Sequence, residues 1–145
     1  MFCFVTITTL VNLTSLASAQ SPYLPPSPVF LNVHGEYLDA AEAGQQIMIM
    51  KIIENREEFE QPFVALLEVR DSNDTSQYIA WQRGILPISD VDNNRLAEAT
   101  IGFSWSANVP STYQARVYVI DSFDHPNILQ AIASAEIVVI DSSAE

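Results

Sequence analysis

The fold is decided by the segment LAEATIGFSW, residues 96–105. Apolar side chains alternate along it with polar or small ones, which is the period-two pattern of a β-strand with one buried face. Its apolar positions are Ala97, Ala99, Ile101, Phe103 and Trp105. The segment TYQARVYVI, residues 112–120, repeats the pattern through Tyr113, Ala115, Val117 and Val119. The two segments predict two half-buried strands.

Strand-like runs bounded by turn residues recur elsewhere in the chain. They are 29–33, 46–53, 62–70, 78–82 and 134–140. Arg83-Gly84 is expected to end the strand 78–82, and residues 127–133 are the only helix candidate. Because strands do not alternate with helices, antiparallel sheets are expected, and a sandwich of two sheets hides both inner faces.

Tyr113 follows Pro110-Ser111-Thr112 at the mouth of the penultimate expected strand. An immunoglobulin-type sandwich keeps its tyrosine corner there, with the hydroxyl bonded to backbone upstream. We expect structural roles for Tyr113, Trp105 and Trp81. The sequence thus predicts an all-β fold, a seven-stranded antiparallel immunoglobulin-like β-sandwich preceded by a signal peptide.

The N-terminus has the form of a secretory signal. An uncharged apolar run ends at Ala17-Ser18-Ala19, whose small side chains suit the signal peptidase. We expect a signal peptide at 1–19, a Pro-rich linker at 20–28, the sandwich at 29–141 and a tail at 142–145. The run lacks a Lys or Arg before it, so an uncleaved anchor is the alternative. Cleavage predicts a secreted or envelope-associated protein with no membrane insertion of its own.

Composition narrows the function further. Six basic residues stand against 18 acidic ones, giving a formal charge of −12. Such a surface repels phosphate backbones, so nucleic acid is not expected as a partner. Cys3 is the only cysteine and leaves with the signal, which excludes a disulfide framework and a thiolate metal site. We expect no cofactor.

No residue pattern indicates catalysis. His34 and His125 are the only histidines, and neither belongs to a G-x-S-x-G or H-E-x-x-H motif. Asp124 adjoins His125, but neighbouring side chains on extended backbone point in opposite directions, so it is not expected to orient the ring. Met48 and Met50 have thioethers suited to copper(I), but a strand buried or covered on both faces is the preferred explanation because no second histidine lies near His34 in the sequence. The sequence predicts that the chain is not an enzyme.

Two loops carry clustered oxygen ligands of the kind that calcium prefers, which favours this cation over copper(I). The candidates are Asp90 and Asp92 in one loop and Asp121 and Asp124 in another. Arg95 stands where an EF-hand needs glycine, so only an irregular site is expected, and turn-forming Asp and Asn explain the same residues. Asn73-Asp74-Thr75 is an N-x-T sequon on an expected turn, which makes Asn73 a glycosylation candidate.

Several motifs occur in an order found in a known family. They are Gln61-Pro62-Phe63-Val64, Val69-Arg70-Asp71-Ser72, Ala80-Trp81, Phe103-Ser104-Trp105, Pro110-Ser111-Thr112-Tyr113 and Val119-Ile120-Asp121-Ser122. The series resembles the secreted immunoglobulin-like modules, of the CARDB or fibronectin type III kind, in surface proteins of ammonia-oxidising archaea. It covers about residues 44–140, and Ser111 stands where that family usually has glycine. The resemblance implies the fold and export and no catalytic residues.

The expected function is that of a non-catalytic module in protein–protein association or surface structure. An accessory subunit docked on the outer face of a membrane complex is the alternative, and an extracellular carbohydrate-active or calcium-dependent binding protein is the third. Apolar side chains on the outward registers of several strands favour a protein partner in the envelope or self-association. They are Phe30, Met48, Met50, Val64, Leu66, Tyr118, Val138 and Ile140. A loop or the Pro-rich arm covering this stripe is the competing explanation.

Overall fold

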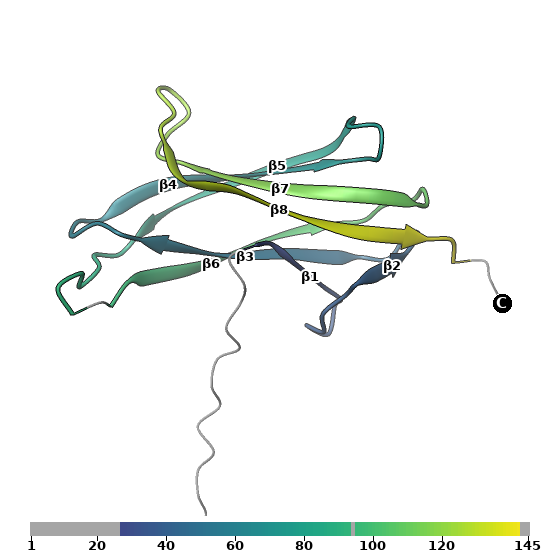
Figure 1. Ribbon diagram of the computed structural model, residues 1–145, viewed down its shortest axis with the longest axis horizontal. Coiled ribbons are helices and arrows are strands. Elements are labelled where there is room, and N and C mark those ends of the chain that lie inside the picture. The colour runs from purple at the N-terminus through teal and green to yellow at the C-terminus, as the bar shows by residue number, and fades with distance from the viewer. Residues whose placement is uncertain (1–26, 94, 143–145) are drawn as a thin grey trace, which may run out of the picture.

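The computed structural model describes residues 27–93 and 95–142. The expected signal peptide, most of the linker and most of the tail lie outside these ranges. The described chain forms eight strands (Figure 1): β1 Val29–Leu31, β2 Ala40–Glu42, β3 Ile47–Asn55, β4 Gln61–Arg70, β5 Ser76–Leu86, β6 Ala97–Trp105, β7 Ser111–Ile120 and β8 Ile128–Ile140.

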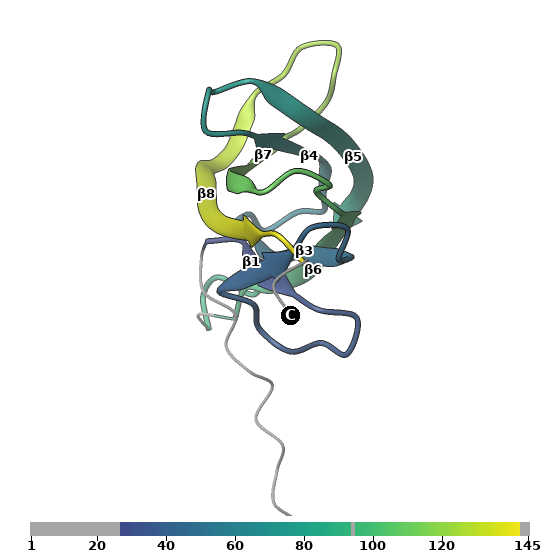
Figure 2. The ribbon, with the colours of Figure 1, turned by 90° about the vertical axis from the view of Figure 1, so that its right-hand side faces the viewer.

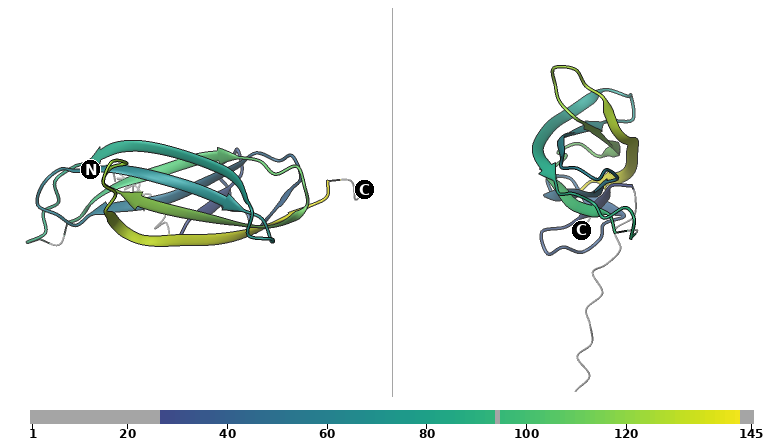
Figure 3. Two further views of the ribbon diagram at one scale, coloured as in Figure 1. Left: turned by 90° about the horizontal axis from the view of Figure 1, so that it is seen from above. Right: turned by 90° about the vertical axis from the view of Figure 1, so that its left-hand side faces the viewer.

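The strands form two facing sheets, as Figure 2 shows from the end of the molecule. One sheet has the order β1-β3-β6, and the other has the order β2-β8-β7-β4-β5. Seen from above, β5, β4, β7 and β8 lie side by side, with β5 at one edge (Figure 3). The predicted all-β sandwich is therefore confirmed.

The predicted strand number and the all-antiparallel pairing are wrong. The additional strand is β2, which pairs parallel with β8 through Ala40↔Val138 and Glu42↔Ile140. With three residues, only Ala41 of which is buried, β2 is too short to show a hydrophobic period.

Strand β5 continues past the glycine that was expected to end it. Gly84 lies opposite Phe63 of β4, and a Cβ at Gly84 would come within 2.9 Å of the Phe63 ring. A glycine inside a strand marks such a close approach, not only a stop. The alternation of outward-facing and inward-facing side chains in β5 therefore continues through Arg83 to Ile85.

The helix expected at 127–133 is also wrong, because residues 128–133 begin β8 and Asn127 belongs to the loop before it. They pair with the end of β7, through Ile120↔Ile128 and Val119↔Gln130. Two register shifts in this stretch break the alternation that would have identified a strand. Pairing with β7 supplies backbone hydrogen bonds to this segment, some of which a short isolated helix would leave unmade.

The core lies between the inner faces of the two sheets. Strands β3, β4, β6 and β7 each bury every second side chain there, as the period-two pattern predicts. The most completely buried large side chains include Ile47, Ile49, Ile53, Leu67 and Ile101. Among the described residues, no helix is long and apolar enough to cross a membrane.

A buried polar side chain joins two loops at one end of the sandwich. Asn55 is 1% exposed, and its amide nitrogen donates to the carbonyls of Phe59 and Pro87 at 2.8 and 2.7 Å. Its side-chain oxygen accepts from the N–H of Glu57, and the Ser89 hydroxyl donates to the Asn55 carbonyl. These bonds fasten the loop after β3 to the loop after β5.

Candidate association surface

An apolar patch lies on the outer face of the five-stranded sheet. Ile79, Trp81 and Ile85 alternate along β5 with their side chains on this face, and they are 65%, 55% and 62% exposed. Phe123, half exposed, comes from the loop between β7 and β8. We call these four residues the outer patch.

Trp81 and Phe123 are in direct contact. Their rings meet edge to face at 90°, with 5.4 Å between centroids. Strand β4 separates β7 from β5, so the loop that carries Phe123 crosses over β4 to reach Trp81. Figure 2 shows this loop projecting from the outer side of the five-stranded sheet. Trp81 therefore does not belong to the core, and its expected structural role reduces to this surface contact.

Asp121 shapes the loop that holds Phe123. Its carboxylate accepts from the backbone N–H and the side-chain amide of Asn127, at 2.9 and 2.7 Å, and from the N–H of Ser122. These hydrogen bonds, those of Asn127 first, hold the pKa of Asp121 below its ordinary value. The carboxylate closes the loop in the manner of an Asx turn.

The calcium candidates do not gather into one site. Both Asp90 carboxylate oxygens accept from the Asn93 amide, and Asp121 is bonded within its own loop. Asp92 and Asp124 are exposed on these same two loops. Across 27–93 and 95–142, no three His, Cys, Asp or Glu side chains come together as metal ligands.

The predicted apolar stripe is divided between the two sheets. Met48 and Met50 face outward from the three-stranded sheet, whereas Val138 and Ile140 face outward from β8 in the other. Phe30 is paired with Ile49 and belongs to the core, so its assignment to the outward register is wrong. Of the outer patch on β5, Ile79 and Trp81 lie within the strand expected at 78–82, whereas Ile85 was missed because that strand was expected to end at Gln82. The alternation of Ile79, Trp81 and Ile85 was the signal that identifies them.

Ion pairs lie on the outer face of β4 and β7 and on the turn after β4. Arg70 bonds to Glu68 at 3.0 Å and to Asp74 at 3.0 Å, and Arg116 also reaches Asp74. The hydrogen bonds of Arg70 hold the pKa values of Glu68 and Asp74 below their ordinary values. Tyr118 donates to Glu68 as well. In the strand order, these ion pairs thus lie between the outer patch on β5 and the exposed apolar side chains of Val138 and Ile140 on β8.

Asn73 lies on an exposed turn between β4 and β5. The Asp71 carboxylate accepts from the N–H groups of Asn73 and Thr75, and Asp74 has a left-handed φ of 58°. Asp tolerates this conformation better than most residues. The sequon side chain therefore stands on a rigid, accessible turn.

The remaining two structural candidates meet in the core. The Tyr113 hydroxyl donates to the Val109 carbonyl at 2.8 Å, four residues upstream, which is the tyrosine-corner contact. The ring of Trp105 packs edge-on to Tyr113, with centroids 5.0 Å apart. Both side chains are buried.

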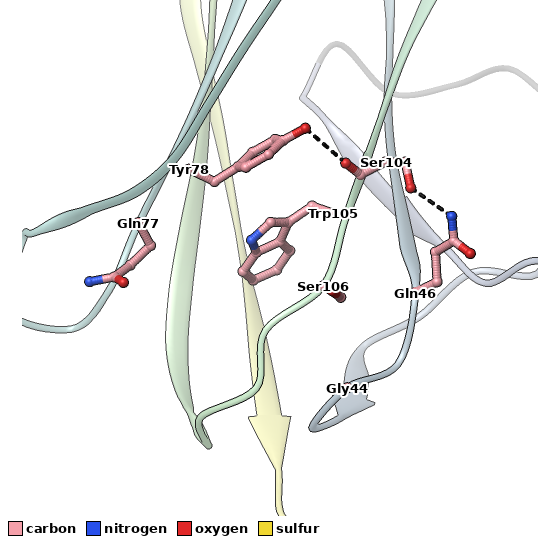
Figure 4. Close-up of a pocket in the computed structure, with 7 residues that line it drawn as sticks. All are labelled: Gly44, Gln46, Gln77, Tyr78, Ser104, Trp105 and Ser106. Atoms are coloured by element: carbon pink, nitrogen blue, oxygen red, sulfur yellow. Dashed lines mark hydrogen bonds between the residues drawn. The ribbon is translucent and has the colours of Figure 1, made fainter.

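A cavity of about 560 Å³ opens between the edges of the two sheets (Figure 4). It is lined by Gly44, Gln46, Gln77, Tyr78, Ser104, Trp105 and Ser106. The Gln46 amide donates to the Ser104 hydroxyl, and the Tyr78 hydroxyl donates to the Ser104 carbonyl, so much of the polar lining is already paired. No carboxylate, imidazole or amine is among these residues, and Tyr78 is the one titratable side chain of this lining.

Comparisons with known proteins find similarity in fold alone. The sequence matches no family model and no curated protein. The CARDB domain of a Pyrococcus furiosus protein, solved with two metal ions, superposes with a TM-score of 0.51 at 12% identity, covering 82% of this chain and 99% of that one. The C-terminal domain of Wzt gives 0.59 at 8% identity, covering 79% and 71%.

A cycloisomaltooligosaccharide glucanotransferase from Paenibacillus sp., complexed with cycloisomaltoheptaose, gives a TM-score of 0.55 at 12% identity. The alignment covers 81% of this chain but only 14% of that enzyme. These similarities support the predicted immunoglobulin-like sandwich and extend to the fold alone.

Proposed function

We propose that this chain is a non-catalytic immunoglobulin-like module of the cell envelope or exterior that binds a protein partner through the outer patch. The observation that carries the proposal is the exposed aromatic pair Trp81–Phe123, flanked on β5 by Ile79 and Ile85. Contiguous exposed apolar side chains mark interaction sites, and tryptophan is enriched among the residues that dominate binding energy.

The layout of the face supports this use. An apolar centre with a polar rim is the usual anatomy of a protein interface. Here the outer patch adjoins the ion pairs of Arg70 and Arg116, which lie toward the other end of the same sheet. The outer patch would supply affinity and the ion pairs would supply orientation.

The location is a separate part of the proposal. It rests on the signal-like residues 1–19, the charge of −12 and the single cysteine within that segment. The exposed turn of Asn73 makes this residue available to a glycosyltransferase in a host that has one. Peptide mass spectrometry of native material that finds only bare Asn73 would remove the glycan from the proposal.

Site-specific photo-cross-linking tests the partner surface. A photoreactive residue replaces Ile79 in one variant and Ile140 in another, in cells that produce the protein. Both positions are at least half exposed on the outer face of the same sheet, but Ile140 lies on β8, far from β5 in the strand order. We expect a discrete protein adduct from position 79 and none from position 140. Equal adducts from both, or none from position 79, would contradict the proposal.

A further inference from the structure

Strand β5 is the one long sheet edge in the described part of the chain that carries no acidic residue. It pairs with β4 on one side and with no strand on the other. The remaining edges are different: β1 and β2 have three residues each, the parts of β3 and β8 that they leave open carry Glu54 and Glu136, and β6 carries Glu98. At β6 the Ser104 carbonyl also accepts from the Tyr78 hydroxyl.

The usual protections of an edge strand are few on β5. Natural edges are shielded by charges, proline, bulges or shortness, because their unpaired N–H and C=O groups otherwise recruit another strand. The 11 residues of β5 contain no proline and one charged residue, Arg83. The register shift lies near its start, opposite Val69 and Arg70, and leaves 78–86 regular.

The charge distribution indicates which strand would add here. Two copies of a chain with a charge of −12 repel each other over most of their surfaces. Along β5 there is no carboxylate, so two copies meet there without placing acidic side chains opposite each other. A basic partner would be drawn instead to the acidic surfaces elsewhere.

We propose that β5 pairs antiparallel with β5 of a second copy, so that two five-stranded sheets become one continuous sheet. This inference rests on the proposed function and names its partner. Trp81 is the middle residue of β5, so a two-fold axis near it pairs the strand along its whole length. In registers that keep both outer faces on one side, odd-numbered residues face odd-numbered residues. Ile79, Trp81 and Ile85 of both copies then lie on one outer surface, together with the Arg83 side chain of each copy.

Sedimentation of the purified full chain tests this pairing. We expect a concentration-dependent dimer. Trp81→Lys should weaken dimerisation by at least about thirtyfold, because the substitution removes an aromatic anchor from both copies. The matched control is Ile140→Lys, which places the same charge on the outer face of β8 and should leave the dimer intact. A monomer at the highest attainable concentration, or equal effects of the two substitutions, would overturn the pairing.

A second variant tests whether misfolding, rather than loss of the β5 contact, weakens the dimer. Arg83 is exposed, and Arg83→Glu gives β5 an acidic side chain in each copy. The dimer should weaken, and added salt should restore part of it because screening reduces repulsion between like charges. A variant with an unchanged melting temperature and an unchanged dimer would contradict the proposal.

Hydrogen exchange and the envelope cross-links separate this inference from the proposed function. The backbone amides of 79–85 that do not bond to β4 should become protected on dimerisation. Protection of these same amides in a monomer would show that another segment of the chain covers the edge, and it would overturn the second copy as occupant. A monomeric chain that still forms a foreign adduct at position 79 overturns the self-pairing and leaves the proposed function standing. With neither dimer nor adduct, both fail.

Discussion

The Tyr113 hydroxyl donates a 2.8 Å hydrogen bond to the Val109 carbonyl, four residues upstream. The bond joins the start of β7 to the chain that leads into it, beside the Trp105 ring. It fixes the entry of β7 into the five-stranded sheet.

Tyr113→Phe removes this hydroxyl and little else. We expect a loss of about 1 kcal/mol in the free energy of unfolding, the net contribution of one such hydrogen bond. The denaturation midpoint measures it, with Tyr37→Phe as a control on an exposed ring. An unchanged midpoint for Tyr113→Phe would show that the corner contributes nothing to stability.

Asn55→Ala should cost more than Tyr113→Phe. The substitution leaves the Phe59 and Pro87 carbonyls and the Glu57 N–H without their partner. Leaving buried polar groups unpaired costs about 1–3 kcal/mol, and we expect a loss in the upper part of that range. Chemical denaturation measures it, and a loss below that of Tyr113→Phe would contradict the role given to Asn55.

How far the sequence predicts the fold depends on local regularity. Strands β6 and β7 have unbroken alternation, and the segments predicted for them agree with the structure within one residue at each end. Strand β8 loses its alternation at two register shifts, so its first half is visible only through its pairing with β7. Tertiary pairing, not local propensity, decides that segment.

The outer patch also could not be predicted in full from local sequence patterns. Its β5 residues alternate in the sequence, but Gly84 reads as a stop until Phe63 is seen lying against it. Phe123 is 42 residues from Trp81, and only the order of β7, β4 and β5 brings the two rings together. No local pattern marks a contact of this kind.

Stability should fall in acid through Glu68 and Asp74. Arg70 lowers the pKa of both carboxyls in the folded chain from ordinary values of 4.5 and 3.8. The unfolded chain therefore binds protons first as the pH falls. The stabilisation is complete above the unfolded pKa values and is lost as the pH drops through the lower folded ones.

The measurement is the urea midpoint from neutral pH down to acid. The double variant Glu68→Gln, Asp74→Asn should be less stable than the natural chain at neutral pH and should show a shallower acid dependence. Asn suits position 74 because it tolerates the left-handed φ found there. Parallel curves for the two proteins would contradict a contribution from these ion pairs.

Native material should begin at Gln20. Ala17-Ser18-Ala19 is the expected cleavage site, and removal of 1–19 also removes Cys3. Intact-mass measurement of protein from the cells that make it checks both points at once. A mass that includes Met1 would favour the anchor over the cleaved signal.

Coverage of the outer patch in the cell is the central claim, and radical footprinting of Trp81 tests it most directly. Hydroxyl radicals oxidise exposed aromatic side chains, and Trp81 is 55% exposed while Phe59, at 58%, serves as the control in the loop after β3. We expect oxidation of Trp81 to be much lower in the native envelope than in the dilute purified chain, with Phe59 oxidised equally in both. Equal oxidation of Trp81 in the two settings would show an uncovered patch and contradict the account.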